Sequence, residues 1–339
     1  MKNIFFKLIV LEMLLVSSVS AQSLQRFANI GDLKLQSGKT LYNCQIGYRT
    51  FGSINVDSSN IIIYPSWFGG TSEAIGTLIQ KYNFIDTTKY FIIAVDALGN
   101  GISTSISNSD NPDSVFYNLT IDDMVNANYL LLLNHFNIKK IFAAVGGSMG
   151  SMQVLLMAVM YPNLVNKIVA YVATPKMTSS DLLWMNTQQN LIELTLNCGM
   201  PEREVKKLSD MLAANFARTP DYVTTHTDLS EFPDYLKSFD KEPGKIFTLQ
   251  NYLTQLKAMM KLDISKYSDG LMEETAKKIK AKMFIIVSKS DLMVNPVEAI
   301  NLAQLTKSKL IILDNNCGHL AVSCEIERCR KEIDLFLNE

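Results

Sequence analysis

The sequence predicts an α/β protein built on a mostly parallel central sheet, with helices on both faces and a helical insertion. Short apolar runs alternate with helix-like segments along most of the chain. The runs are apolar throughout, which is typical of parallel strands that are buried on both faces. The alternation stops between about residues 176 and 263, where only helical patterns occur, and it then resumes.

The first half of the chain supplies most of the expected strands. Residues 33–52 alternate apolar and polar side chains between glycines, which predicts a β-hairpin or a β-meander. Thr120 and Asp123 resemble a capping pair at the start of a helix. Apolar strands are expected within 60–67, 90–101, 139–147 and 165–175, and helices within 121–136 and 151–162.

The second half contains the insertion and the return of the strand–helix alternation. Helical patterns in the insertion cover residues 180–196, 202–217 and 246–262. Strands are then expected within 281–291 and 309–319, and helices at 297–306 and 326–338. We therefore divide the chain into a core, residues 22–176 and 264–339, and a helical lid insertion, residues 177–263.

The N-terminal segment has the features of a targeting signal. Lys2 and Lys7 lie at the start of an apolar stretch, and this stretch ends in the small residues 19–21. The stretch is too short for a comfortable membrane span. We expect residues 1–21 to be a cleaved signal peptide, which predicts a secreted or periplasmic protein without stable membrane insertion after cleavage.

Composition narrows the class of partner. The chain has 32 Lys and Arg against 33 Asp and Glu, with no basic block, so a nucleic-acid partner is not expected. Its five cysteines have no metal-binding spacing, and neither a metal nor a cofactor is expected. Export would permit disulfides. Two alternatives stay open: buried free thiols, or a bridge among Cys317, Cys324 and Cys329.

Residues 146–150 match the pattern G-x-S-x-G, between a predicted strand and a predicted helix. A nucleophilic serine needs a strained turn that holds its hydroxyl above the sheet edge, and the tight packing there excludes side chains on its neighbours. Ser148 is therefore the candidate nucleophile. The amide N–H of Met149, at the start of the helix, is a candidate donor to an oxyanion.

A serine nucleophile needs a base, and the base needs an orienting acid. Among the three histidines, only His319 follows a strand at the sheet edge that carries the serine turn. Asp291 ends an earlier strand at the same edge, which gives the order Ser148, Asp291, His319 expected of this turn. Asp314 is a rival acid in a less suitable place, and His135 and His226 receive no role.

The second oxyanion donor should come from the loop after an early strand, "YPSWFGG". By position the donor is Trp67 or Phe68, and we favour Trp67. Gly69 and Gly70 would let the backbone approach a substrate closely. We therefore expect Phe68, Gly69 and Gly70 to contact the substrate.

With these residues in place, nearly the whole mature chain resembles the homoserine O-acetyltransferase family, which has the α/β-hydrolase fold. The resemblance implies an acyl-enzyme on Ser148, with His319 as base and Asp291 as its partner, and a homodimer through the lid helices. It is carried by the stretches 48–55, 59–70, 96–105, 120–127, 146–165 and 315–321.

The chain departs from that family where the amino-acid acceptor would bind. Phe247, Thr248 and Leu249 replace an arginine-bearing pattern, and residues 99–107 are also altered. A zwitterionic acceptor needs paired charges. We therefore expect a serine hydrolase acting on a small acyl ester, with chain length set by the lid. An acyltransferase of the homoserine type is the alternative, and a non-catalytic binding protein is disfavoured because the triad is complete.

Overall fold

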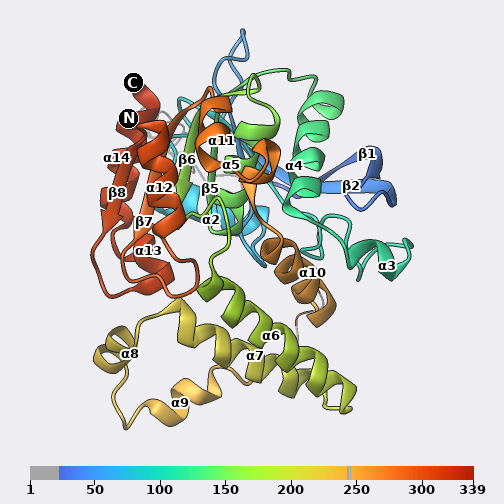
Figure 1. Ribbon diagram of the computed structural model, residues 1–339, viewed down its shortest axis with the longest axis vertical. Coiled ribbons are helices and arrows are strands. Elements are labelled where there is room, and N and C mark those ends of the chain that lie inside the picture. Colours follow the sequence, from blue (N-terminus) through green and yellow to red (C-terminus); the bar gives the residue numbers. More distant parts are fainter. Residues whose placement is uncertain (1–22, 243, 245) are drawn as a thin grey trace, which may run out of the picture.

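The computed structural model describes residues 23–242, 244 and 246–339 (Figure 1). The predicted signal peptide, residues 1–21, lies outside the described residues. No helix in the described part of the chain is long and apolar enough to cross a bilayer.

The core is one 8-stranded sheet with the order β1-β2-β4-β3-β5-β6-β7-β8. The first two strands form a hairpin, but its first strand begins at Arg26, before the predicted range 33–52. The second strand, β2, also pairs antiparallel with β4. The remaining pairs are parallel, which confirms the mostly parallel sheet. The strands are β1 (Arg26–Lys34), β2 (Thr40–Phe51), β3 (Ile61–Pro65), β4 (Phe91–Val95), β5 (Ile141–Gly147), β6 (Val165–Tyr171), β7 (Lys282–Ser288) and β8 (Lys309–Leu313).

Helices cover both faces of this sheet, as the apolar strands require. On one face, α2 (Ser72–Tyr82) and α14 (Ile326–Asn338) pack their buried side chains against strand residues such as Tyr64. On the other face lie α4 (Ile121–Leu130), α5 (Met149–Met160) and α12 (Val297–Thr306). The central strands β3 to β7 thereby bury apolar side chains on both faces.

The helix at residue 121 covers the predicted range, and its last turn is π-helical. Thr120 and Asp123 form a capping box at the start of α4. The helix then widens into one π-helical turn, η1 (Leu131–His135), within the predicted range 121–136. Several short helices were not predicted, because segments of three to seven residues carry too little periodicity. These are α3 (Asp113–Phe116), α11 (Met272–Lys278), α13 (Ala321–Cys324) and the 3₁₀ turns η2 (Ile264–Ser268) and η3 (Gly318–Leu320).

The insertion is helical and returns to its starting point. Lys176 and Asp263 pair in an isolated antiparallel bridge, with a salt bridge of 3.1 Å between their side chains. Figure 1 shows α6 to α9 gathered at one end of the molecule, beyond the sheet. The insertion contains α6 (Ser179–Asn197), α7 (Glu202–Ala217), α8 (Pro220–His226), α9 (Phe232–Lys237) and α10 (Leu249–Met260).

Candidate active site

Ser148 occupies the tight turn between β5 and α5. Its φ is +52°, in the left-handed region that residues other than glycine rarely adopt. The flanking glycines are required by packing: a Cβ on Gly147 would lie 2.0 Å from the Tyr171 ring, and one on Gly146 would lie 2.3 Å from the carbonyl oxygen of Gly150. The turn therefore fixes the serine in the conformation that a nucleophile at the sheet edge needs.

The structure brings Ser148, His319 and Asp291 into one chain of hydrogen bonds. Nε2 of His319 lies 2.9 Å from Oγ of Ser148. Nδ1 of the same ring lies 2.7 Å from Oδ2 of Asp291. Both His319 and Asp291 are buried. The spacing matches what a base needs to take a proton from a serine hydroxyl, with a carboxylate orienting the ring.

The second carboxylate oxygen of Asp291 holds the acid in place. It accepts the backbone N–H groups of Met293 and Val294, each at 2.9 Å. One oxygen is therefore fixed by the loop after β7, and the other faces the imidazole. The rival, Asp314, is exposed and pairs with Lys289 at 2.9 Å.

The other two histidines lie in different surroundings. Nε2 of His135 lies 2.7 Å from the hydroxyl of Tyr48, at the end of the π-helical turn. His226 is exposed at the end of α8, where its ring stacks on Tyr222 with 3.9 Å between the ring centroids. Neither is hydrogen bonded to Ser148.

The candidate oxyanion donors belong to two segments that pack closely. Met149 is the first residue of α5, and Trp67 follows β3. A Cβ on Gly150 would lie 2.5 Å from the carbonyl oxygen of Pro65, so the start of the helix touches the end of the strand. Nε2 of Gln153 also donates to the carbonyl of Ser66 at 3.1 Å. This packing holds the segment that carries Trp67 next to the start of the helix that carries Met149.

Gly69 and Gly70 have a packing role in the structure. Gly69 has a φ of +65°, and a Cβ there would lie 2.9 Å from the Phe247 ring. Its N–H donates to Oε1 of Gln255 at 2.9 Å, and the N–H of Gly70 donates to the carbonyl of Trp67 at 2.8 Å. Phe68 and Trp67 line the cavity beside Ser148, whereas Gly69 and Gly70 are not among its lining residues.

Two buried glutamines hold this loop and were not singled out from the sequence. Gln153 binds the loop from α5, and Gln255 binds it from α10 while also donating to the carbonyl of Leu98 at 3.1 Å. Glutamine in a helix usually lies at the surface. The sequence therefore offers no signal that separates these two from surface glutamines.

A cavity of about 260 Å³ opens beside Ser148 and His319. Its lining contains no Lys, Arg, Asp or Glu side chain and no residue of the lid insertion. The Tyr171 ring lies against Gly147, and Phe84 packs on that ring edge-on with 5.6 Å between centroids. The cavity therefore extends from the serine toward α2 and is an apolar site. The remaining lining residues include Leu78, Val172, Met293, Leu320, Val322 and Ile326.

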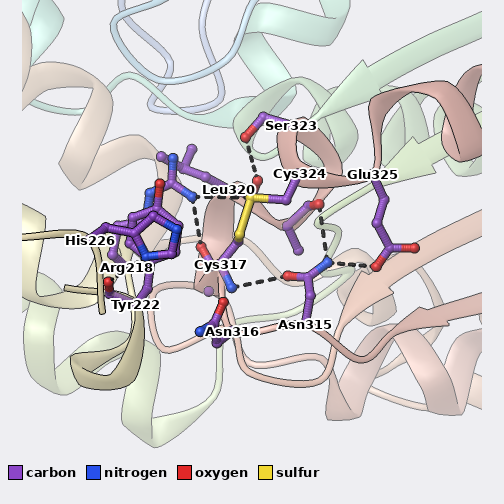
Figure 2. Close-up of a disulfide and its surroundings, with 12 residues drawn as sticks. Arg218, Tyr222, His226, Asn315, Asn316, Cys317, Leu320, Ser323, Cys324 and Glu325 are labelled. Carbon is purple, nitrogen blue, oxygen red and sulfur yellow. Dashed lines mark hydrogen bonds between the residues drawn. A yellow bond between two sulfur atoms is a disulfide. The ribbon is translucent and has the colours of Figure 1, made fainter. Parts of the chain in front are cut away.

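The loop that carries His319 is closed by a disulfide between Cys317 and Cys324 (Figure 2). This resolves the alternatives that the sequence left open for these cysteines. Cys329 is a buried free thiol, and burial raises its pKa to about 11. Burial likewise raises the pKa of the Cys44 thiol to about 12. Cys198 is free and exposed.

Comparison with known proteins agrees with this geometry. Residues 60–323 match the model of the alpha/beta hydrolase fold family. The chain belongs to this family. The predicted fold class and the predicted kinship are thereby confirmed.

Both esterases and acyltransferases are similar to this α/β-hydrolase. The ethyl acetate hydrolase of Pseudomonas veronii is 30% identical over 275 residues, which cover 76% of this chain and 78% of that protein. The structure of an acetylester hydrolase from Corynebacterium glutamicum is similar with a TM-score of 0.81 and 27% identity, covering 94% and 96% of the two chains. The homoserine O-acetyltransferase of Methanococcus vannielii is 28% identical, covering 83% of this chain and 65% of that protein.

Proposed function

We propose that this α/β-hydrolase is a serine ester hydrolase that works through an acyl-enzyme on Ser148. The observation that carries the proposal is the continuous hydrogen-bonded chain from Ser148 through His319 to Asp291. The similarity to an ethyl acetate hydrolase and to an acetylester hydrolase supports the same activity.

The reaction follows from the geometry. His319 takes the proton of Ser148 as Oγ attacks the acyl carbon, and the amides of Met149 and Trp67 stabilise the negative oxygen. His319 then gives its proton to the leaving alkoxide, and the alcohol departs. A water molecule loses a proton to His319 and attacks the acyl-enzyme, and the return of that proton to Ser148 releases the carboxylic acid.

The cavity supports an uncharged ester with a short apolar acyl chain. Its apolar lining offers no counter-ion to a charged group, and desolvating an unpaired charge there would be costly. A volume of about 260 Å³ equals the space of roughly nine water molecules at about 30 Å³ each, which suits a short acyl chain. Because the lining belongs to the core, we propose that the core, and not the lid as expected from the sequence, sets the acyl chain length.

Hydrolysis is favoured over transfer to an amino acid by the stretch that departs from the transferases. The Phe247 ring packs on Phe68 with 5.7 Å between centroids. The Thr248 side chain caps α10, and Leu249 is buried. These residues therefore offer no charge to a zwitterionic acceptor. A purely binding role is set aside because the site is complete and the relatives are enzymes.

The test measures the fate of the acyl group. Purified protein is assayed with p-nitrophenyl acetate, with and without homoserine, and then with acetyl-CoA plus homoserine. We expect release of p-nitrophenol and free acetate at a rate that homoserine does not change. Formation of O-acetylhomoserine would instead favour the acyltransferase.

We further propose that the protein is exported and that two copies associate through the lid. Residues 1–21 support export, and N-terminal sequencing of the mature protein should begin at Gln22. Leu183 and Leu194, on α6, are 72% and 63% exposed, which supports a contact there. Light scattering should give a dimer mass for the wild type and a monomer mass for Leu183→Glu/Leu194→Glu.

A further inference from the structure

The loop that carries His319 is held from two independent sides. From within, the disulfide Cys317–Cys324 closes the loop around the histidine. On its outer side, the same loop contacts the lid segment between α7 and α8. Figure 2 shows Arg218, Tyr222 and His226 of the lid together on one side of the disulfide, with Asn315 and Glu325 of the core on the other.

The lid contact consists of two short hydrogen bonds to Asn316. Oγ1 of Thr219 donates to the backbone carbonyl of Asn316 at 2.5 Å. Nδ2 of Asn316 donates to Oδ2 of Asp221 at 2.6 Å. The Thr219 hydroxyl also accepts the N–H of Tyr222 as the N-cap of α8. The same side chain thus starts a lid helix and binds the loop of the base.

The backbone of the lid segment also packs against the loop that carries His319. Gly318, next to His319, has a φ of +63°, and a Cβ there would lie 2.9 Å from the carbonyl oxygen of Ala217. The guanidinium of Arg218 lies 4.2 Å from the centroid of the Tyr222 ring and donates to the carbonyl of Cys317 at 3.5 Å. The lid backbone therefore rests directly on the residue that precedes the base.

The core side fixes the other end of the loop. Oγ of Ser290 donates to the carbonyl of Asn315 at 2.7 Å, and the N–H of Gly318 donates to the same hydroxyl at 3.3 Å. Ser290 precedes Asp291, so the acid and the base share this anchor. The insertion contributes the contacts at Asn316, Cys317 and Gly318, and those at Asn316 are its side-chain hydrogen bonds shorter than 3 Å.

We propose that Thr219 and Asp221 are positioning residues, which hold His319 in line with Ser148 through Asn316 and share this task with the disulfide. The inference rests on the proposed ester hydrolysis. Neither lid residue lines the cavity, so substrate binding does not depend on them directly. A base displaced by a fraction of an ångström loses rate, because proton transfer needs hydrogen-bond geometry.

The first experiment compares three threonine variants with p-nitrophenyl acetate. Thr219→Val removes the hydroxyl, and Thr219→Ser keeps it. Thr224→Val is the matched control, because its hydroxyl donates only within the exposed α8, to Pro220. We expect Thr219→Val to lower kcat about tenfold with KM within about twofold, since small displacements of reacting groups cost such factors. Thr219→Ser and Thr224→Val should keep the wild-type kcat.

The second experiment examines the Asn316–Asp221 pair by a double-mutant cycle. Asp221→Ala and Asn316→Ala should each lower kcat, and the double variant should be no slower than the slower single variant, because both remove one contact. This cycle leaves the Thr219 cap of α8 intact, so it carries the test if Thr219→Val does not fold. Independent, multiplicative losses would contradict the contact.

The third experiment removes the disulfide Cys317–Cys324, which restrains the loop of His319 from within the core. Cys317→Ser/Cys324→Ser should lower kcat moderately, and the loss on adding Thr219→Val should exceed the product of the separate losses. Hydrogen exchange of residues 316–324 should accelerate in the same order. An unchanged kcat in folded Thr219→Val, or no change in exchange, would overturn the inference. A wild type without esterase activity would instead overturn the proposed function.

Discussion

Nε2 of His319 lies 2.9 Å from Oγ of Ser148, although the two residues are 171 positions apart in the chain. The serine is held by the turn after β5, and the histidine follows β8, the outermost of the parallel strands. A parallel sheet brings the loops after its strands to one edge, so distant residues meet there.

Replacing the acid should reduce turnover strongly while preserving the fold. Asp291→Asn keeps the size of the side chain but removes the charge that stabilises the protonated imidazole and orients its ring. We expect kcat to fall by about 10⁴-fold. Asp314→Asn is the matched control, because Asp314 is exposed and pairs with Lys289. Equal kcat values for the two variants would assign the acid elsewhere.

Filling the cavity should shorten the acyl chains that the enzyme accepts. Leu78, on α2, lines the cavity. A tryptophan there would exclude longer acyl chains sterically. We therefore expect Leu78→Trp to lower kcat/KM for p-nitrophenyl hexanoate at least about tenfold more than it lowers kcat/KM for p-nitrophenyl acetate. Leu183→Trp, on the exposed side of the lid, should leave the ratio unchanged. A shifted ratio in the lid variant alone would return chain-length control to the lid.

The three free cysteines should differ in reactivity. Burial raises the pKa of Cys44 to about 12 and that of Cys329 to about 11, so both are almost entirely protonated at pH 8. Since the thiolate is the nucleophile, native protein should react with iodoacetamide at the exposed Cys198 alone. Peptide mapping should find all three thiols modified after unfolding without reductant. Rapid native modification of Cys44 would contradict its burial.

A methyl group on the glycine before the nucleophile should destabilise the protein. In Gly147→Ala the new Cβ would lie 2.0 Å from the buried Tyr171 ring, which is hydrogen bonded to Tyr64. We expect the free energy of unfolding in urea to fall by about 3 kcal/mol, typical of a strongly overpacked core. Gly244→Ala, where a Cβ meets nothing within 4 Å, should be nearly neutral.

The sequence was most informative where chemistry and chain order restrict the choice. The glycines around Ser148 and the single histidine after a late strand were enough to select the residues that the structure brings together. The apolar strands likewise predicted the parallel sheet, because burial on both faces leaves no alternation.

Features that depend on long-range packing could not be predicted. Whether Cys317 pairs with Cys324 or Cys329 depends on where the loop and α14 lie in space. Gly69 resembles a substrate-facing glycine, yet its small size accommodates Phe247, which is distant in sequence. The contact of Asn316 with Thr219 joins two loops whose sequences show no reason to meet.

The most direct test of the account is covalent labelling of the nucleophile. Native protein is incubated with a fluorophosphonate probe, and the modified residue is mapped by mass spectrometry in the wild type and in Ser148→Ala. The account predicts one adduct on Ser148 in the wild type and none in the variant. A folded wild type without an adduct, or equal labelling of both proteins, would contradict an activated serine at this turn.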